Sequence, residues 1–138
     1  MIKIFNFCIY LIIFLVFIFQ MAYCKGFEMK KTIMIDLDGV LDNYEKYTED
    51  IPSIKKGAKD FIIKLSKDYE LILFTTRSPM LATKWLINND LDKYFKDVTN
   101  VKTPAYIYID DRAIQFNGDY NKTLNEITNF NVHWKNQS

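Results

Sequence analysis

The stretch from Ile33 to Leu41 constrains the fold of this chain more than any other. It begins with three apolar residues and continues with two carboxylates one residue apart, Asp36 and Asp38, before a glycine. A continuous apolar run that ends in a glycine turn is typical of a buried strand in a parallel sheet. Ligands of open α/β sheets bind just outside the carboxyl ends of such strands. The sequence therefore predicts that both carboxylates lie at the mouth of a ligand site.

The chain beyond residue 29 alternates apolar runs with helical patterns. This alternation indicates an α/β fold with a single Rossmann-like parallel sheet flanked by helices. The connections after the first and second strands are each long enough for one helix, so neither has room for a cap domain. Further strands are predicted over 71–74, 98–101 and 105–109, and helices over 55–67, from Ser78 to about residue 88, and after Asp119.

Polar residues follow the other strong strands of the predicted sheet. They are Thr75, Thr76 and Arg77, and later Asp110, Asp111 and Arg112. Because the carboxyl ends of parallel strands meet at one edge of a sheet, we expect these residues to converge with Asp36 and Asp38. Carboxylates that lie so close repel each other and need a cation, a proton or a specific function. A helix N-cap is the structural alternative for the second acidic pair.

The phrase from Asp36 to Leu41, Asp-Leu-Asp-Gly-Val-Leu, resembles the first motif of the haloacid dehalogenase-like (HAD) phosphohydrolases. Three further matches follow in the family's order, so that the resemblance covers about Lys31 to Asp119. It implies that Asp36 is the nucleophile and that Asp38 is the general acid and base, with its backbone carbonyl as a metal contact. Thr75 stands where the family places a Ser or Thr, whose hydroxyl binds a phosphoryl oxygen.

The resemblance also implies a Mg²⁺ site built from carboxylates. Asp110 and Asp111 match the acidic fourth motif, with Asp111 as a direct ligand and Asp110 bound directly or through water, beside Asp36 and Asp38. Hard oxygen ligands of this kind suit Mg²⁺.

Three basic residues and one threonine are the other candidates. Lys102 is the candidate for the cation of the third motif, although it lies only eight residues before Asp110 and many family members place a helix between the two. A solvated loop lysine is the alternative for Lys102. The candidate substrate-binding residues are Thr76, Arg77 and Arg112, and a salt bridge is the alternative for Arg112.

These matches predict a Mg²⁺-dependent phosphatase that acts through an aspartyl-phosphate at Asp36. The phrase from Tyr108 to Phe116, with Trp85 earlier, is similar to a small capless group of HAD-like hydrolases. The alternative is a catalytically silent HAD-like domain that binds a phosphorylated ligand or a partner. The short spacing between Lys102 and Asp110, which departs from the common family pattern, favours this alternative. A response-regulator receiver domain is disfavoured, because it carries its phosphorylated Asp after a middle strand.

Residues 1–28 differ from the domain over 29–138. The apolar run from Phe7 to Phe19 has 13 residues, which suits a signal peptide better than a membrane span of about 20 residues. Ala22-Tyr23-Cys24 is an acceptable cleavage site. A membrane anchor over residues 4–23 and a translation start at Met29 are the open alternatives. The protein is thus expected to be secreted or membrane-anchored if this segment is real, and cytoplasmic if the chain begins at Met29.

Charge and cysteine content restrict the partners. The net charge is +1, and acidic and basic side chains balance beyond residue 28, so the sequence gives no electrostatic argument for nucleic acid. Cys8 and Cys24 both precede the domain, which therefore has no disulfide. The expected partner is a phosphorylated substrate of unknown size, with an oligomer as an open alternative. His133 is expected at the surface or in packing.

Overall fold

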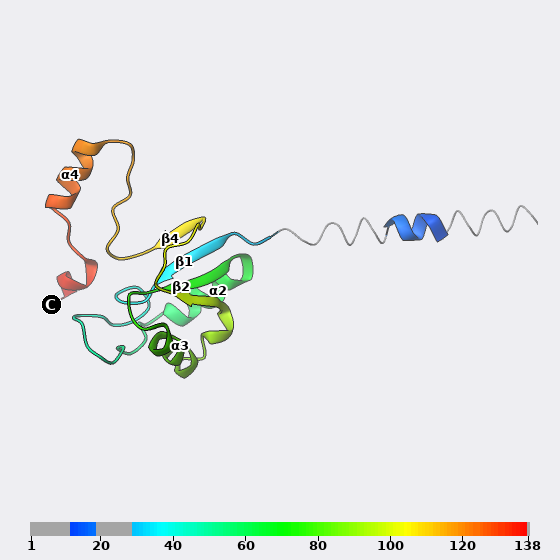
Figure 1. The fold of residues 1–138 in the computed structure, drawn as a ribbon, viewed down its shortest axis with the longest axis horizontal. Coiled ribbons are helices and arrows are strands. Elements are labelled where there is room, and N and C mark those ends of the chain that lie inside the picture. Colours follow the sequence, from blue (N-terminus) through cyan, green and yellow to red (C-terminus); the bar gives the residue numbers. More distant parts are fainter. Residues whose placement is uncertain (1–11, 19–28, 138) are drawn as a thin grey trace, which may run out of the picture.

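The computed structural model describes residues 12–18 and 29–137, and its centre is one four-stranded parallel sheet (Figure 1). The strand order is β3-β2-β1-β4, with every neighbouring pair parallel. The single parallel α/β sheet that the sequence predicts is therefore confirmed. The strands are β1 (Thr32–Asp36), β2 (Glu70–Phe74), β3 (Phe95–Thr99) and β4 (Ile107–Ile109).

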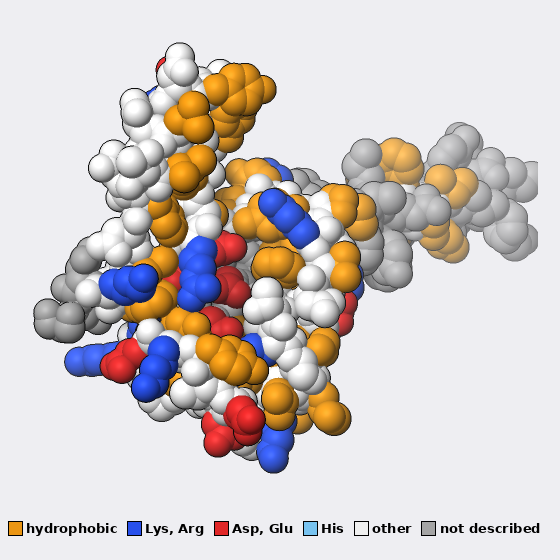
Figure 2. All heavy atoms as spheres, turned by 60° about the vertical axis from the view of Figure 1, so that its left-hand side comes forward, with side chains coloured by type: hydrophobic (Ala, Val, Ile, Leu, Met, Phe, Trp, Pro, Cys, Tyr) orange, Lys and Arg blue, Asp and Glu red, His pale blue; other side chains and the backbone are white. Residues whose placement is uncertain are grey.

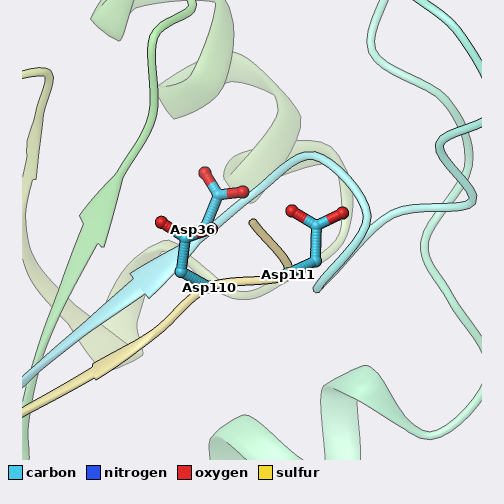
Figure 3. Close-up of side chains that lie close together, drawn as sticks. All are labelled: Asp36, Asp110 and Asp111. Carbon is cyan, nitrogen blue, oxygen red and sulfur yellow. The ribbon is translucent and has the colours of Figure 1, made fainter. Parts of the chain in front are cut away.

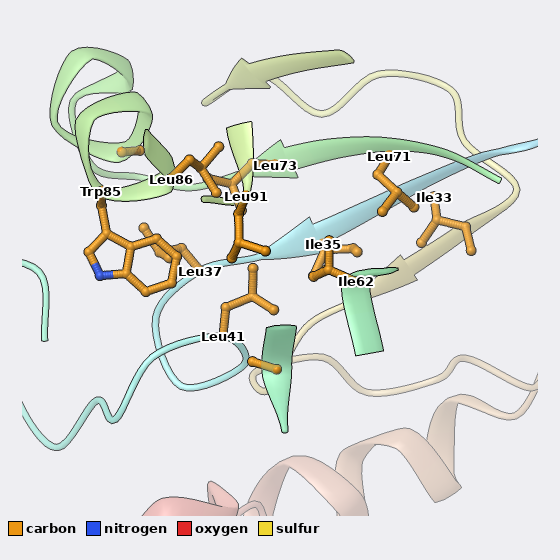
Figure 4. Packing of buried hydrophobic residues seen from close by; sticks show 12 residues of the cluster. Ile33, Ile35, Leu37, Leu41, Ile62, Leu71, Leu73, Trp85, Leu86 and Leu91 are labelled. Carbon is orange, nitrogen blue, oxygen red and sulfur yellow. The ribbon is translucent and has the colours of Figure 1, made fainter. Parts of the chain in front are cut away.

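One face of the sheet carries the hydrophobic core, which Figure 4 shows from close by. Alternate residues of a strand point to the same face, and on this face β1 and β2 contribute side chains that are at most 2% exposed. Two helices cover it, α2 (Ala58–Asp68) and α3 (Pro79–Asn88). The main contacts come from Ile33, Ile35, Leu71 and Leu73 of the strands, Ala58 and Ile62 of α2, and Ala82, Trp85 and Leu86 of α3.

The other face is crossed by the chain between β3 and β4. These two strands lie at opposite edges of the sheet, so residues 100–106 must pass over β2 and β1. Met34 on this face is 1% exposed, and the Thr103 hydroxyl lies 3.5 Å from its sulfur. An extended loop, and not a helix, therefore covers the centre of this face.

The observed bounds of two elements, β3 and α2, differ from the predicted ones. Strand β3 begins at Phe95, three residues before the predicted strand over 98–101. Its middle residues Lys96 and Asp97 are exposed, and its register against β2 shifts once, so its apolar signal is interrupted. The predicted helix over 55–67 begins at Ala58, because Gly57 adopts a left-handed conformation with φ of 89° before it.

The C-terminal part leaves the sheet and returns to it. Helix α4 (Tyr120–Thr128) is capped by Asp119, whose side chain accepts a hydrogen bond from the Lys122 N–H at 3.0 Å. None of its residues is buried, and it projects away from the sheet in Figure 1. The chain then turns back, so that Val132 is 7% exposed. Two short 3₁₀ segments complete the fold, η1 (Asp92–Tyr94) and η2 (His133–Gln137).

Residues 12–18 are helical, and their apolar side chains are between 48% and 60% exposed. Within the described residues, no helix combines the length and the apolar character that a membrane crossing requires. The predicted cleavage site at residues 22–24, both cysteines and the other residues of 1–11 and 19–28 lie outside the described ranges. The connections from β1 to β2 and from β2 to β3 are fully described, and neither contains a cap domain.

Candidate active site

Three carboxylates meet at the carboxyl edge of the sheet (Figure 3). Asp36 is the last residue of β1, and Ile35 beside it pairs with Ile109, the last residue of β4. The register therefore brings Asp110 and Asp111 next to Asp36. One carboxylate oxygen from each of the three acids lies within 4.8 Å of the others. In Figure 2 acidic side chains lie together in a hollow of the surface, with basic side chains at its rim.

The environment of Asp36 disfavours its charged form. Burial is the main cause that raises its pKa from 3.8 to about 7. A hydrogen bond from the Leu37 backbone N–H opposes this effect, and the neighbouring carboxylates Asp110, Asp111 and Asp38 add to it. The charged groups that shift this pKa most are all carboxylates. A proton or a bound cation is thus needed to stabilise the cluster near neutral pH.

Asp111 fits the role of a metal ligand. Its side chain is 1% exposed, its Oδ2 accepts a hydrogen bond from the Trp134 indole N–H, and its buried Oδ1 has no hydrogen-bond partner within the described residues. Asp110 is exposed, and its Oδ1 accepts from the Arg112 backbone N–H at 2.7 Å. This bond closes a turn, and no helix begins at the acidic pair, so the N-cap alternative is wrong. Clustered carboxylates with a buried oxygen that accepts no hydrogen bond from the described residues match the donor set of Mg²⁺.

Asp38 points its carboxylate to a different partner, Arg77. The Arg77 Nε lies 2.7 Å and 3.0 Å from the two Asp38 oxygens, and its Nη1 donates to the Thr48 carbonyl at 2.7 Å. The Arg77 side chain is only 3% exposed, and its Nη2 has no partner within the described residues. The arginine that the sequence suggests for substrate binding is therefore buried and paired with Asp38, and its contact with a substrate stays a prediction.

Thr75 and Thr76 follow β2 at the same edge of the sheet. Thr75 is fully buried, and its Oγ1 accepts a hydrogen bond from the Arg77 backbone N–H at 3.2 Å. Its own N–H donates to the Thr99 carbonyl, which ties the end of β2 to β3. Thr76 is exposed. Contact of either residue with a phosphoryl group stays a prediction.

The two remaining candidate cations lie in different places. Lys102 is exposed on the loop that crosses the sheet, with its Nζ 4.3 Å from the centroid of the Tyr108 ring. Arg112 lies beside the acids, with its Nε 3.8 Å from the Asp111 Oδ1. Its guanidinium also stacks on the rings of Tyr44 and Trp134. The structure thus brings Arg112 to the cluster, whereas the third-motif role of Lys102 stays a prediction.

Sequence reasoning missed several residues around the glycine turn. The Asp42 Oδ1 accepts from the Gly39 N–H at 2.8 Å, and the Lys55 Nζ donates to the Gly39 carbonyl at 2.7 Å. The His133 Nε2 lies 3.0 Å from the same Lys55 Nζ. Asp42 follows two apolar residues in the sequence, which is a weak sign of a buried acid. Lys55 and Trp134 have no local signal, because distant segments bring them to the site.

Acids at the ends of the first and fourth strands of a parallel sheet, and a Thr after the second, form the arrangement that the resemblance to HAD-like phosphohydrolases implies. The family comparison agrees, since the chain matches the family model for NLI interacting factor-like phosphatase over residues 31–136. The chain belongs to this family, which is a family of HAD-like phosphatases.

One solved structure supports the fold independently. A conserved protein from Bacteroides thetaiotaomicron is similar with a TM-score of 0.50 and 22% sequence identity, over 79% of this chain and 98% of that chain. At this identity the similarity shows the fold alone. The comparison with curated proteins found no match.

Proposed function

We propose that this chain is a Mg²⁺-dependent phosphomonoesterase that works through an aspartyl-phosphate on Asp36. The observation that carries the proposal is the convergence of Asp36, Asp110 and Asp111 within 4.8 Å at the carboxyl edge of the sheet. The family supports a phosphatase of the HAD type. The dependence on Mg²⁺ and the covalent intermediate go beyond what membership in the family supports, and they are our proposal.

The three acids would hold the metal, and the buried Asp111 Oδ1, which has no hydrogen-bond partner within the described residues, is the oxygen available to it. A bound Mg²⁺ would neutralise phosphoryl charge and so allow an anionic nucleophile to approach an anionic substrate. For Asp38 the sequence predicts a metal contact, and its backbone carbonyl is the group left for it, because its side chain is paired with Arg77.

The chain's own residues would then carry out two displacements. In the first, an Asp36 oxygen forms a bond to phosphorus while the bond from phosphorus to the leaving oxygen breaks, and Asp38 supplies the proton that this oxygen takes up. In the second, Asp38 removes a proton from water as the water oxygen attacks phosphorus and the bond to Asp36 breaks. Splitting one difficult displacement into two lowers the barrier of each. Arg77 holds Asp38 in place for both steps.

A second candidate is a catalytically silent domain that binds a phosphorylated ligand or a partner. It is favoured by the position of Lys102, the candidate third-motif cation, because its ammonium lies over the ring of Tyr108. Turnover of a broad panel of phosphate esters would exclude it.

The proposal is tested by hydrolysis of p-nitrophenyl phosphate with Mg²⁺ and with EDTA. Asp36→Asn is expected to lower kcat by about a thousandfold or more, because it removes the nucleophile. Asp68→Asn is the matched control, since this aspartate is exposed at the end of α2 and is expected to keep wild-type activity. Activity that survives in both EDTA and Asp36→Asn would contradict the proposal.

A further inference from the structure

The C-terminal segment Val132–Lys135 returns to the acidic cluster after the excursion of α4. Val132 is buried, the His133 Nε2 lies 3.0 Å from the Lys55 Nζ, and the Trp134 indole N–H donates to the Asp111 Oδ2. Trp134 is 23 residues from Asp111 in the sequence and lies outside every motif of the candidate site. A residue from the end of the chain thus contacts an acid that is placed to bind the metal.

The indole ring of Trp134 is fixed on several sides. The Tyr44 ring packs edge-on against it at a centroid distance of 5.2 Å and an angle of 74°, and the Arg112 guanidinium lies 5.6 Å from its centroid. Gly39 passes so close that an added Cβ would lie 2.8 Å from the indole nitrogen and 2.5 Å from the Asp111 Oδ2. The contact between indole and carboxylate is therefore built into a tightly packed corner, and it requires glycine at position 39.

The two oxygens of Asp111 have different environments. Oδ2 accepts the indole N–H, whereas Oδ1 is buried and has no hydrogen-bond partner within the described residues. An indole can only donate a hydrogen bond, so it neither competes as a metal ligand nor takes the second oxygen. A donor to a carboxylate also forms one of the stronger kinds of hydrogen bond, which restricts rotation of the group.

We infer that Trp134 is a positioning residue of the metal site, which holds the Asp111 Oδ2 so that Oδ1 faces the metal. The inference rests on the proposed function for the metal itself, but concerns a residue that no motif assigns. Groups that hydrogen-bond to metal ligands orient them, and loss of such a group typically weakens metal binding by about 10- to 100-fold. Docking of the C-terminal segment would thus complete the metal site.

The first experiment compares metal affinity in two matched variants of the full chain, by calorimetric titration with Mn²⁺ in the absence of substrate. Trp134→Phe keeps an aromatic ring and removes the N–H, and is expected to raise the Kd by about 10- to 100-fold. Trp85→Phe removes the other indole N–H, which donates to the Pro52 carbonyl in the core, and is expected to leave the Kd within about twofold of wild type. Equal Kd values in wild type and Trp134→Phe would overturn the inference.

The second experiment records the metal response in the unaltered sequence, and the two variants serve only to assign its signals. In protein labelled with ¹⁵N-tryptophan, the Trp134 indole N–H signal is expected to shift with Mg²⁺ and to broaden with Mn²⁺. The Trp85 signal is expected to stay unchanged with Mg²⁺. A Trp134 signal unmoved by saturating metal would overturn the inference while leaving the phosphatase proposal intact. Wild-type protein that binds neither metal would overturn both.

Discussion

At the scale of single residues, Asp42 is a buried acid whose ionisation opposes folding. Burial raises its pKa from 3.8 to about 6, and the hydrogen bond from Gly39 opposes this only in part. Between these two pH values the folded protein keeps a proton that the unfolded chain releases. The contribution of Asp42 to the free energy of unfolding therefore falls as pH rises through this window and is constant above it.

Asp42→Asn is expected to remove this dependence. An amide oxygen can still accept the Gly39 N–H, and the amide does not ionise. Urea unfolding should show the variant gaining stability relative to wild type between about pH 4 and pH 7, by at most about 3 kcal/mol, since each pKa unit corresponds to about 1.4 kcal/mol. A difference in stability between the two proteins that does not change with pH would show that folding does not raise the pKa of Asp42.

Arg77 provides a second prediction at this scale. Arg77→Ala would leave the Asp38 carboxylate, 15% exposed, without its partner, and is expected to lower the free energy of unfolding by about 3 kcal/mol or more. The control is Lys96→Ala, which breaks an ion pair with Glu70 between side chains 64% and 33% exposed and should cost less than about 1 kcal/mol. Similar costs for the two substitutions, measured by chemical denaturation, would argue against a structural role for Arg77.

At the scale of elements, α2 and α4 differ in how they are packed, although both have an apolar stripe. Ile62 of α2 is 0% exposed, whereas Ile127 of α4 is 57% exposed. Ile62→Ala should therefore cost about 2 to 5 kcal/mol, and Ile127→Ala should stay within about 0.5 kcal/mol of wild type. Denaturant unfolding of both variants makes the comparison. A large cost at Ile127 would mean that α4 is packed against another surface in solution.

The elements also show what sequence reasoning could and could not predict. The strands at the centre were predictable because their apolar runs are continuous, as from Ile33 to Ile35, and the acids that end them follow from the same pattern. Strand β3 was placed three residues late, because its exposed residues Lys96 and Asp97 interrupt the pattern. The contact of Trp134 with Asp111 depends on the path of the chain through α4, which no local pattern encodes.

At the scale of the whole molecule, the domain beyond residue 28 has its own core. Strand β1 begins at Thr32, and the hydrophobic cluster of the described residues runs from Ile33 to Leu91. A chain that starts at Met29 is therefore expected to fold and to melt in one cooperative transition, as followed by circular dichroism. A Met29 chain without cooperative melting, beside a full chain that melts cooperatively in detergent, would mean that the first 28 residues belong to the fold.

Asp36 is proposed to become covalently phosphorylated during turnover. The most direct measurement is acid quenching of the enzyme during p-nitrophenyl phosphate hydrolysis, followed by borohydride reduction and peptide mass spectrometry, because reduction converts an aspartyl-phosphate to homoserine. We expect homoserine at position 36 in wild type and in Asp68→Asn with Mg²⁺, and none in EDTA. Continued turnover with Asp36 unmodified, or homoserine at another aspartate, would contradict Asp36 as the nucleophile.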